Sequence, residues 1–426
     1  MAYPTRLDSG PWFTVGEQLD GLSAYQRIRD ARSRSVNSCR PYCVYVHVPF
    51  CHSICNFCAL YTHGVGANAE DRFDEYIDVV LRSLPHNPWY GSDEAPTTVH
   101  FGGGTPLSLG VKRFTRLVRA LTEAFGTSSA CEWAVETTTS SLDGATVDAL
   151  EGLQFRRIHL GIQTLDDTTR ARIGRRESGA TAIQRIVALE ARGFLTSVDL
   201  ILGLDGVDGA ILTEDLRRLY EAGVRMFSIC ELRERSRKAS VSGQGEREKS
   251  QRNYAFWRMI WDFMEEVGLS PIHVGQFACT QADNLYFTHP ARGEDCVAIG
   301  PYAHGSAKEV AYGNHLLPHY YEAVRAGRSP IALGVDYRAA ELAVCALERE
   351  LLTHSVSQAV LRGVLEAYPN RFESILDSWL TNDLIREVDD GLGLALTVCG
   401  SWFVGNMILE TRIMAELCQS NQRASF

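Results

Sequence analysis

The sequence predicts an α/β protein built on a barrel-like parallel sheet, with a smaller helical unit at its C-terminal end. Two observations carry this prediction. Short apolar runs alternate with helical patterns through most of the chain, which is typical of a parallel sheet with right-handed crossovers. From about residue 336 onward, helical patterns follow one another without intervening strands. With 426 residues, 45% of them hydrophobic, the chain can bury a large core.

Six apolar runs are expected to form the strands of the barrel. They cover residues 44–48, 98–101, 133–136, 158–162, 197–202 and 226–229. Helical patterns lie between them, one with its apolar face between Phe73 and Leu84 and another between Val111 and Phe125. In folds of this kind the chemistry lies at the carboxyl ends of the strands. Functional residues are therefore expected directly after the apolar runs.

The segment after the sixth run, residues 231–254, is rich in Arg, Lys, Glu, Ser and Gly and has almost no apolar anchors. Such a run is either a solvated connection or a lid that excludes water from a site. The sequence leaves both interpretations open. A helix is expected over residues 256–267, followed by an irregular stretch through Tyr302.

Three units are expected along the chain. Residues 1–40 form an N-terminal helical extension, residues 41–335 the barrel and its extension, and residues 336–426 a C-terminal substrate-covering domain. The last unit is predicted to hold helices over 339–352, 357–367 and 371–380, then a hairpin over 384–396 with the turn at Asp389-Asp390-Gly391. This arrangement resembles a winged helix. The segment is not basic, so we expect a cover over substrate and not a DNA-binding unit.

Charge and cysteine usage limit the expected partners and compartment. The formal net charge is -10 and no basic cluster is interleaved with aromatic residues, so a nucleic-acid partner is not expected. A signal-peptide pattern and an apolar run of membrane length are both missing from the sequence, so membrane association is not expected either. The twelve cysteines are scattered, as in the reduced thiols of a cytoplasmic protein.

The strongest chemical signal is the run YVHVPFCHSICNFC, which places Cys51, Cys55 and Cys58 at the spacing CxxxCxxC after the first strand. Three thiolates can hold three irons of a 4Fe-4S cubane and leave the fourth iron open to the amino and carboxylate groups of S-adenosylmethionine (SAM). The alternative is half of a structural zinc site, with His52 or His63 as a fourth ligand. Zinc sites of this type normally show a second pair of ligands, and none follows Cys58 at close range.

A glycine run, Gly102-Gly103-Gly104-Thr105-Pro106, follows the second strand directly. Residues without Cβ let backbone N–H groups approach a charged ligand. Taken alone, a glycine triplet is more often a tight turn. Its position beside the cysteine segment favours a role in holding the amino acid part of a ligand of the open iron.

These motifs resemble those of the oxygen-independent coproporphyrinogen III oxidase-like branch of radical SAM enzymes, which includes class C radical SAM methyltransferases. The run YVHVPFC, CNFC, FGGGTP, GIQTLDD, IGRR and SVDLILGL occurs here in the order seen in that branch, between about residues 45 and 305. The resemblance implies a partial TIM-type (β/α)6 radical SAM barrel with a smaller, winged-helix-like C-terminal domain.

The resemblance also implies a role for each matching position. Cys51, Cys55 and Cys58 match the ligands of the 4Fe-4S cluster. The matching SAM contacts are Phe57 against the adenine, Gly103, Gly104 and Thr105 at the methionine end, Glu136 and Arg175 at the first SAM, Gln163, Asp199 and Ile201 around a second SAM, and Tyr45 near both. A carboxylate suits ammonium or ribose hydroxyls, and a guanidinium suits a carboxylate. No catalytic residue is assigned, since His304, Tyr302, Cys230 and Cys279 follow barrel strands without an identified role.

The expected activity is that of a radical SAM C-methyltransferase. One SAM is cleaved to a 5'-deoxyadenosyl radical, and a second supplies a methyl or methylene group to an sp2 carbon of a small aromatic or heteroaromatic metabolite. A flavodoxin or ferredoxin is the expected reductant. The alternatives are a tetrapyrrole enzyme, acting by decarboxylation or haem-ring opening, and a haem chaperone.

Three departures from the branch pattern bear on these alternatives. Decarboxylases carry a further cysteine two residues after the third ligand, where this chain has Leu60. The usual proline of a GLP motif is replaced by Asp205. Chaperone-like members show a His-Asn pair before an aromatic residue, where this chain has Asp283-Asn284-Leu285-Tyr286. Methyl transfer is left as the broadest fit.

Overall fold

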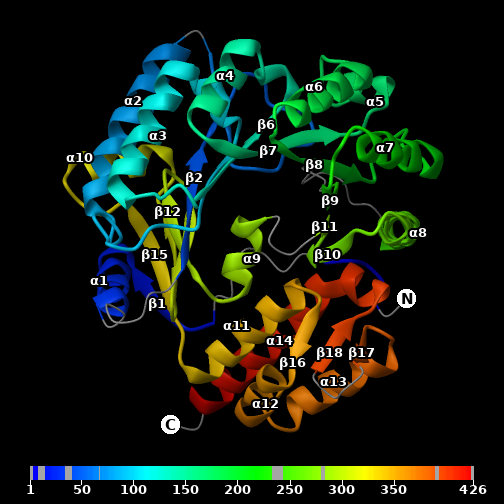
Figure 1. Cartoon of the computed structure of the whole chain (residues 1–426). Coiled ribbons are helices and arrows are strands. Elements are labelled where there is room, and N and C mark those ends of the chain that lie inside the picture. The colour runs from blue at the N-terminus through cyan, green and yellow to red at the C-terminus, as the bar shows by residue number, and fades with distance from the viewer. Residues whose placement is uncertain are drawn as a thin grey trace.

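The computed structural model describes residues 3–7, 15–33, 41–66, 68–232, 243–279, 284–388 and 393–423. Within these residues, thirteen strands form one sheet in the order β1-β15-β14-β13-β12-β2-β5-β6-β7-β8-β9-β11-β10. A smaller C-terminal unit of helices and a three-stranded sheet lies against one end of it (Figure 1).

The centre of the large sheet is a run of six parallel strands, each hydrogen-bonded to the next. They are β2 (Tyr42–Val48), β5 (Thr98–Gly103), β6 (Glu132–Thr137), β7 (Phe155–Gln163), β8 (Leu195–Leu202) and β9 (Met226–Glu231). Each contains one of the six apolar runs, which confirms the predicted (β/α)6 barrel. Because the strands are parallel, their carboxyl ends meet at one edge.

Helices between these strands cover the outer face of the sheet (Figure 1). They are α2 (Ala69–Ser83), α3 (Val111–Phe125), α4 (Gly144–Gly152), α5 (Asp167–Arg172), α6 (Gly179–Ala191) and α7 (Gly209–Glu221). The last four begin at an Asp or Ser side chain that accepts a backbone N–H three residues later, namely Asp143, Asp166, Ser178 and Asp208. These caps satisfy amide groups that the first helical turn leaves without partners. The predicted faces of α2 and α3 are buried, which confirms both helices.

The sheet extends beyond the barrel on both sides. Next to β2 lie β12 (Asp295–Ile299), which is parallel, and then β13 (His304–Ala307), β14 (Val310–Asn314), β15 (Ile331–Asp336) and β1 (Glu17–Asp20), which are antiparallel. Next to β9 lie β11 (Gln276–Ala278) and β10 (Ser270–His273), both antiparallel. The predicted irregular stretch through Tyr302 is therefore wrong. Its three strands, SPIH, QFA and DCVAI, are short, and each contains a polar residue at one end, so none forms a clear apolar run.

The predicted helix over residues 256–267 is longer than expected. In the structure α8 covers Gly243–Glu266, so residues 243–254 are helical, which corrects that part of the predicted loop or lid. Residues 233–242 of that prediction lie outside the described residues. The inward positions of the early helix are polar, since Ser250 and Asn253 are buried. Polar residues at inward positions hide the apolar periodicity by which a helix is recognised.

A short helix, α9 (Leu285–Ala291), lies inside the curve of the sheet, between β2 and β12 on one side and β10 on the other (Figure 1). The Tyr286 ring stacks on the His100 ring with centroids 4.2 Å apart and on the Tyr45 ring at 5.2 Å. At the other end of the helix, His289 Nδ1 lies 3.3 Å from Thr97 Oγ1, at the start of β5. The helix therefore fills the amino-terminal half of the barrel.

The C-terminal unit follows the predicted order of helices and hairpin. It contains α11 (Ala339–Leu352), β16 (Ser355–Ser357), α12 (Gln358–Ala367), α13 (Arg371–Thr381), β17 (Ile385–Glu387), β18 (Gly393–Leu396) and α14 (Val398–Arg423). Strands β17 and β18 pair antiparallel, while the predicted turn at Asp389-Asp390-Gly391 lies outside the described residues. Helix α14 was not predicted. Its first turns are buried on nearly every side, so they lack an amphipathic pattern.

The N-terminal extension contains a helix, α1 (Gly21–Ser33), after strand β1. Since β1 pairs with β15, the extension is continuous with the main sheet. The division of the chain at residues 40 and 335 stays a prediction. In the described part of the chain, no helix combines the length and hydrophobicity of a membrane span.

The contact between the barrel and the C-terminal unit generates a prediction about acid stability. His354 Nε2 donates to the carbonyl oxygen of His273, 3.2 Å away, and burial lowers the pKa of each histidine to about 4. The unfolded chain binds a proton at each site below about pH 6.5, whereas the folded chain does so only near pH 4. We expect stability to be complete above pH 6.5 and to fall by about 3 kcal/mol per histidine as the pH drops to 4.

Urea unfolding at pH 7.5, 6.0 and 5.0 measures this loss. The matched variant is His354→Gln, which keeps a donor to the His273 carbonyl but cannot gain the proton, so its stability should fall less steeply over the same range. If the free energy of unfolding fell equally with pH in the two proteins, the assignment to His354 would be contradicted.

Candidate active site

The cysteine loop, residues 51–64, leaves the carboxyl end of β2. It begins at β3 (Phe50–Cys51) and ends at β4 (His63–Gly64), which pair with each other. Cys51, Cys55 and Cys58 are all half-buried free thiols of this one loop, and the Cys58 N–H donates to the Cys55 carbonyl at 3.1 Å. Among the described residues, no group of three or more His, Cys, Asp or Glu side chains surrounds a single point as zinc ligands do. A cubane takes one thiolate per iron, so its ligands need not converge on a single point.

The electrostatics of Cys51 also fit a cationic cluster. Burial raises the pKa of its thiol, a hydrogen bond from Thr105 lowers it, and the neighbouring Cys55 and Cys58 raise it again. Thr105 Oγ1 donates to Cys51 Sγ at 3.5 Å. Three thiolates at this position repel one another, so positive iron would stabilise their ionised forms.

The glycine run at the end of β5 holds the start of this loop. The Gly104 N–H donates to the Val48 carbonyl at 2.8 Å, and the Thr105 N–H donates to the Phe50 carbonyl at 2.7 Å. A Cβ on Gly104 would lie 2.4 Å from the Phe50 carbonyl oxygen, and one on Gly103 would lie 2.7 Å from the His47 ring. These glycines are therefore required for close contact between backbone segments, in addition to any contact with a ligand.

Two carboxylates lie in the carboxyl-terminal halves of β6 and β8, the strands on either side of β7. Glu136, near the end of β6, accepts a hydrogen bond from His100 Nε2 with Oε1 at 2.8 Å. Asp199 of β8 accepts one from His159 Nε2 with Oδ1 at 2.7 Å. Sequence reasoning missed both histidines. Only their positions could have identified these histidines, because each lies on an interior strand face beside a carboxylate of the next strand.

Arg175 and Gln163 meet over the backbone of β7. A Cβ on Gly161 would lie 2.8 Å from Gln163 Nε2 and 3.1 Å from an Arg175 terminal nitrogen. Gln163 adopts a φ of 72°, a left-handed conformation that is unusual for a residue with a side chain. Arg175 Nε is buried and has no hydrogen-bond partner among the described residues. An unsatisfied guanidinium N–H at a strand end fits a carboxylate ligand.

An apolar surface lies beside these polar groups. Ile201, Ile173 and Leu204 form a small buried cluster, and Phe57 of the cysteine loop packs against it. The Arg175 guanidinium lies 5.8 Å from the centroid of the Phe57 ring. The structure thus brings Phe57, Arg175 and Ile201 together, with the planar and apolar surface that an adenine base requires.

Tyr45 and His47 line the β2 side of the site. The Tyr45 hydroxyl lies 3.1 Å from His47 Nδ1, and His47 Nε2 lies 3.1 Å from the Tyr61 carbonyl oxygen. Burial lowers the pKa of His47 to about 4, so its ring is neutral at pH 7. With a carbonyl as its other partner, the ring donates from Nε2 and accepts from Tyr45. Sequence reasoning identified Tyr45 and missed His47, although the two lie on the same face of one strand.

Of the residues left without a role, two join this site. The Tyr302 ring lies 4.7 Å from the Tyr61 ring, 5.0 Å from the His304 ring and 5.8 Å from the His47 ring. Cys230 and Cys279 are exposed, and neither is assigned to this site.

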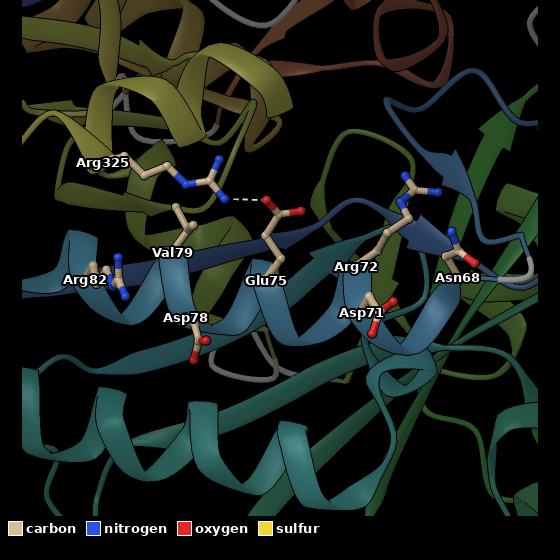
Figure 2. A pocket seen from close by; sticks show the side chains of 8 residues that line it. All are labelled: Asn68, Asp71, Arg72, Glu75, Asp78, Val79, Arg82 and Arg325. Atoms are coloured by element: carbon tan, nitrogen blue, oxygen red, sulfur yellow. Dashed lines mark hydrogen bonds and ion pairs between the residues drawn. The ribbon is translucent and has the colours of Figure 1, made fainter.

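A groove of about 500 Å³ lies elsewhere, on the outer side of α2 and next to α10 (Leu317–Arg325) (Figure 2). Its lining residues are Asn68, Asp71, Arg72, Glu75, Asp78, Val79, Arg82 and Arg325. Acidic and basic side chains alternate along it, and Arg325 pairs with Glu75. Arg72 donates to the Gly64 carbonyl at 3.1 Å and so holds α2 to the end of the cysteine loop. The groove lies outside the barrel and is separate from the strand-end site.

Comparisons with known proteins match most of the barrel and its neighbouring segments. The radical SAM superfamily model matches residues 45–225. Anaerobilin synthase from Escherichia coli O157:H7 is 30% identical over 301 residues, which cover 68% of this chain and 66% of that protein. Oxygen-independent coproporphyrinogen III oxidase from Salmonella typhimurium is 25% identical over 229 residues, which cover 54% of this chain and 47% of that protein. The chain thus spans just under two thirds of the first relative and about half of the second.

One solved structure shares the whole fold. The radical SAM coproporphyrinogen III oxidase (HemN) from Escherichia coli superposes with a TM-score of 0.77, covering 92% of this chain and 94% of that one at 19% identity. The agreement therefore includes the C-terminal unit as well as the barrel.

The backbone contact of Gly104 generates a test of the cysteine loop. We expect Gly104→Ala to push Phe50 and the loop away from β5, because its Cβ would overlap the Phe50 carbonyl. After anaerobic reconstitution, iron and sulfide should fall well below the roughly four of each per chain that a complete cubane needs. The matched control is Gly66→Ala, since Gly66 is exposed and a Cβ there would have no neighbour within 4 Å. Full cluster content in Gly104→Ala would contradict this role of the contact.

Proposed function

We propose that this chain, which belongs to the radical SAM superfamily, is an enzyme that acts on a tetrapyrrole, with haem-ring opening as its reaction. The observation that carries the proposal is the 30% identity with anaerobilin synthase over 301 residues, in a chain whose strand-end site contains the expected ligand types. The relationship to an oxygen-independent coproporphyrinogen III oxidase points to the same substrate class.

The cofactors are a 4Fe-4S cluster and SAM, and the described residues fit both. When bound, they supply a reactive carbon radical produced by one-electron cleavage of the sulfonium. We propose that Cys51, Cys55 and Cys58 hold the cluster through their thiolates. A reductant has to provide the electron, and a flavodoxin or ferredoxin remains our proposal for that partner.

We assign the SAM contacts from the arrangement at the strand ends. The buried Arg175 guanidinium would pair with the carboxylate of the methionine end, near Gly103, Gly104 and Thr105. The Glu136 carboxylate, held by His100, would accept hydrogen bonds from an ammonium or from ribose hydroxyls. Phe57 would cover the adenine. Each contact needs a preorganised side chain, and each of these side chains has a packing or hydrogen-bonding partner that fixes it.

Two features favour ring opening over decarboxylation. The decarboxylases of the resembling branch carry an additional cysteine where this chain has Leu60, and the Leu60 side chain is 58% exposed and supplies no ligand. The greater identity is with anaerobilin synthase and not with the coproporphyrinogen oxidase.

Methyl transfer to a small aromatic acceptor is the second candidate. In its favour, Gln163 and Ile201 lie next to Arg175 and Phe57, and Asp199 lies two residues before Ile201 on β8, where we propose that a second SAM binds. Since methyl transfer consumes two SAM molecules, two sites are a requirement for it. A second site is equally compatible with tetrapyrrole chemistry. We therefore rank tetrapyrrole chemistry first because of the identity with anaerobilin synthase and coproporphyrinogen oxidase.

Anaerobic turnover tests the proposal. The reconstituted enzyme with SAM, dithionite and haem should form 5'-deoxyadenosine in a haem-dependent manner and convert the haem Soret absorbance to that of a linear tetrapyrrole. Cys55→Ala should abolish both signals. Cys418→Ser, a change on α14 far from the cysteine loop in sequence and outside the assigned site, should leave them intact.

The outcomes separate the alternatives. Consumption of coproporphyrinogen III instead of haem would replace ring opening by decarboxylation. S-adenosylhomocysteine together with a methylated small aromatic product, and no consumption of haem, would establish methyl transfer. Stable haem binding without any cleavage of SAM would identify a chaperone and would exclude an enzyme acting on haem.

A further inference from the structure

The barrel interior holds two carboxylate–histidine pairs that are arranged alike. His100 of β5 contacts Glu136 of β6 at 2.8 Å, and His159 of β7 contacts Asp199 of β8 at 2.7 Å. In each pair the histidine side chain is buried, with 0% and 4% of its surface exposed, whereas the carboxylate side chain keeps 28% and 30%. Each carboxylate therefore has one side fixed by a buried ring and another side open to a ligand.

The two pairs differ at the second ring nitrogen. His159 Nδ1 lies 2.7 Å from Ser197 Oγ, so both of its nitrogens have a partner that can accept a proton. His100 Nδ1 is buried without a partner among the described residues, and its ring stacks on Tyr286. An imidazolium donates from both nitrogens and needs two acceptors. Of these two histidines, His159 alone has an acceptor at both ring nitrogens.

We propose that His159 is a positioning residue, held as an imidazolium between Ser197 and Asp199, which keeps the Asp199 carboxylate ionised and aimed at a cationic ligand. The proposal rests on the proposed function, in which that ligand is a second SAM molecule. Asp199 would accept a hydrogen bond from its ammonium or ribose, while Ile201, two residues along the same face of β8, would contact its adenine.

The surrounding charges support an ionised pair. Burial lowers the pKa of His159, but the charge of Asp199 and the hydrogen bond to it raise the pKa by more; Glu136 raises it further and Arg157 lowers it. Burial raises the pKa of Asp199, and His159, a hydrogen bond from Ser228 and the charge of Arg175 together bring it below its ordinary value. Both shifts favour the charged forms of the two side chains in the folded chain.

Removal of the imidazole reverses this balance. Asp199 would keep only Ser228 and the charge of Arg175 against the cost of burial, so its pKa should rise, and carboxyl groups buried without a partner can titrate at neutral pH. A protonated Asp199 cannot attract a cation. Binding at this position would then depend on pH in the neutral range, which it does not do while His159 is present.

The first experiment reads the charge of His159 directly and needs neither cluster nor substrate. In 15N-histidine NMR spectra of the full chain at pH 7.5, the resonance pair that disappears in His159→Gln should show two protonated ring nitrogens. A neutral ring at that position would overturn the proposal, whatever the enzyme acts on.

The second experiment measures SAM binding to the reconstituted enzyme by equilibrium dialysis from pH 6.0 to 8.5. The wild-type chain should bind two molecules across the range. His159→Leu should lose one of them at pH 6.0 and regain it toward pH 8.5, with an affinity change of about tenfold per pH unit. A residue that merely fills space would lose the second molecule equally at every pH, which would contradict the proposal.

Two further variants keep the test interpretable. His159→Gln retains an N–H donor to Asp199, so it should bind the second SAM more tightly than His159→Leu at each pH. Ser197→Ala removes only the contact to His159 Nδ1, so its affinity for the second SAM should lie between those of the wild type and His159→Leu. Unchanged binding in all three variants would overturn the role of His159, and near-UV circular dichroism confirms that the compared proteins are folded. Failure to turn over haem would affect the proposed function alone.

Discussion

The close approach of two backbone segments, the end of β5 and the turn that follows β2, is the constraint on which the rest of the site depends. Gly104 and Thr105 donate their N–H groups to Val48 and Phe50, and this fixes the point at which the cysteine loop leaves the sheet. Thr105 then reaches Cys51 with its side chain. The thiols, the glycine run and the strand ends are thus held by hydrogen bonds that involve backbone atoms and tolerate no Cβ at Gly104.

The strand-end geometry follows from the parallel arrangement. Because β2, β5, β6, β7 and β8 run in one direction, residues far apart in sequence meet at one edge, and the interior faces beneath that edge must be filled. Here the filling is polar. His100 supports Glu136 and His159 supports Asp199, while Tyr45 and His47 hydrogen-bond to each other on β2. Buried polar groups of this kind are stable only when they pair, and pairing restricts their orientations.

Much of this arrangement could be predicted from the sequence, and the exceptions have physical reasons. Short apolar runs between helical patterns identified the six barrel strands, and the spacing of Cys51, Cys55 and Cys58 identified the loop that bears them. Strand β12 escaped because its apolar run is only four residues long and directly follows the acidic Glu294 and Asp295. The early turns of α8 escaped because Ser250 and Asn253 occupy its inward side. His100 and His159 were missed because their importance lies in a partner on the neighbouring strand, and strand register is not visible in a single sequence.

The position of α9 has a kinetic consequence. With Tyr286 stacked on His100 and Tyr45, and with His289 beside the start of β5, this helix blocks the amino-terminal half of the barrel. The strand-end site is then approached from the carboxyl ends of the strands. Two molecules that bind there one above the other would follow an order, with the deeper one arriving first and departing last.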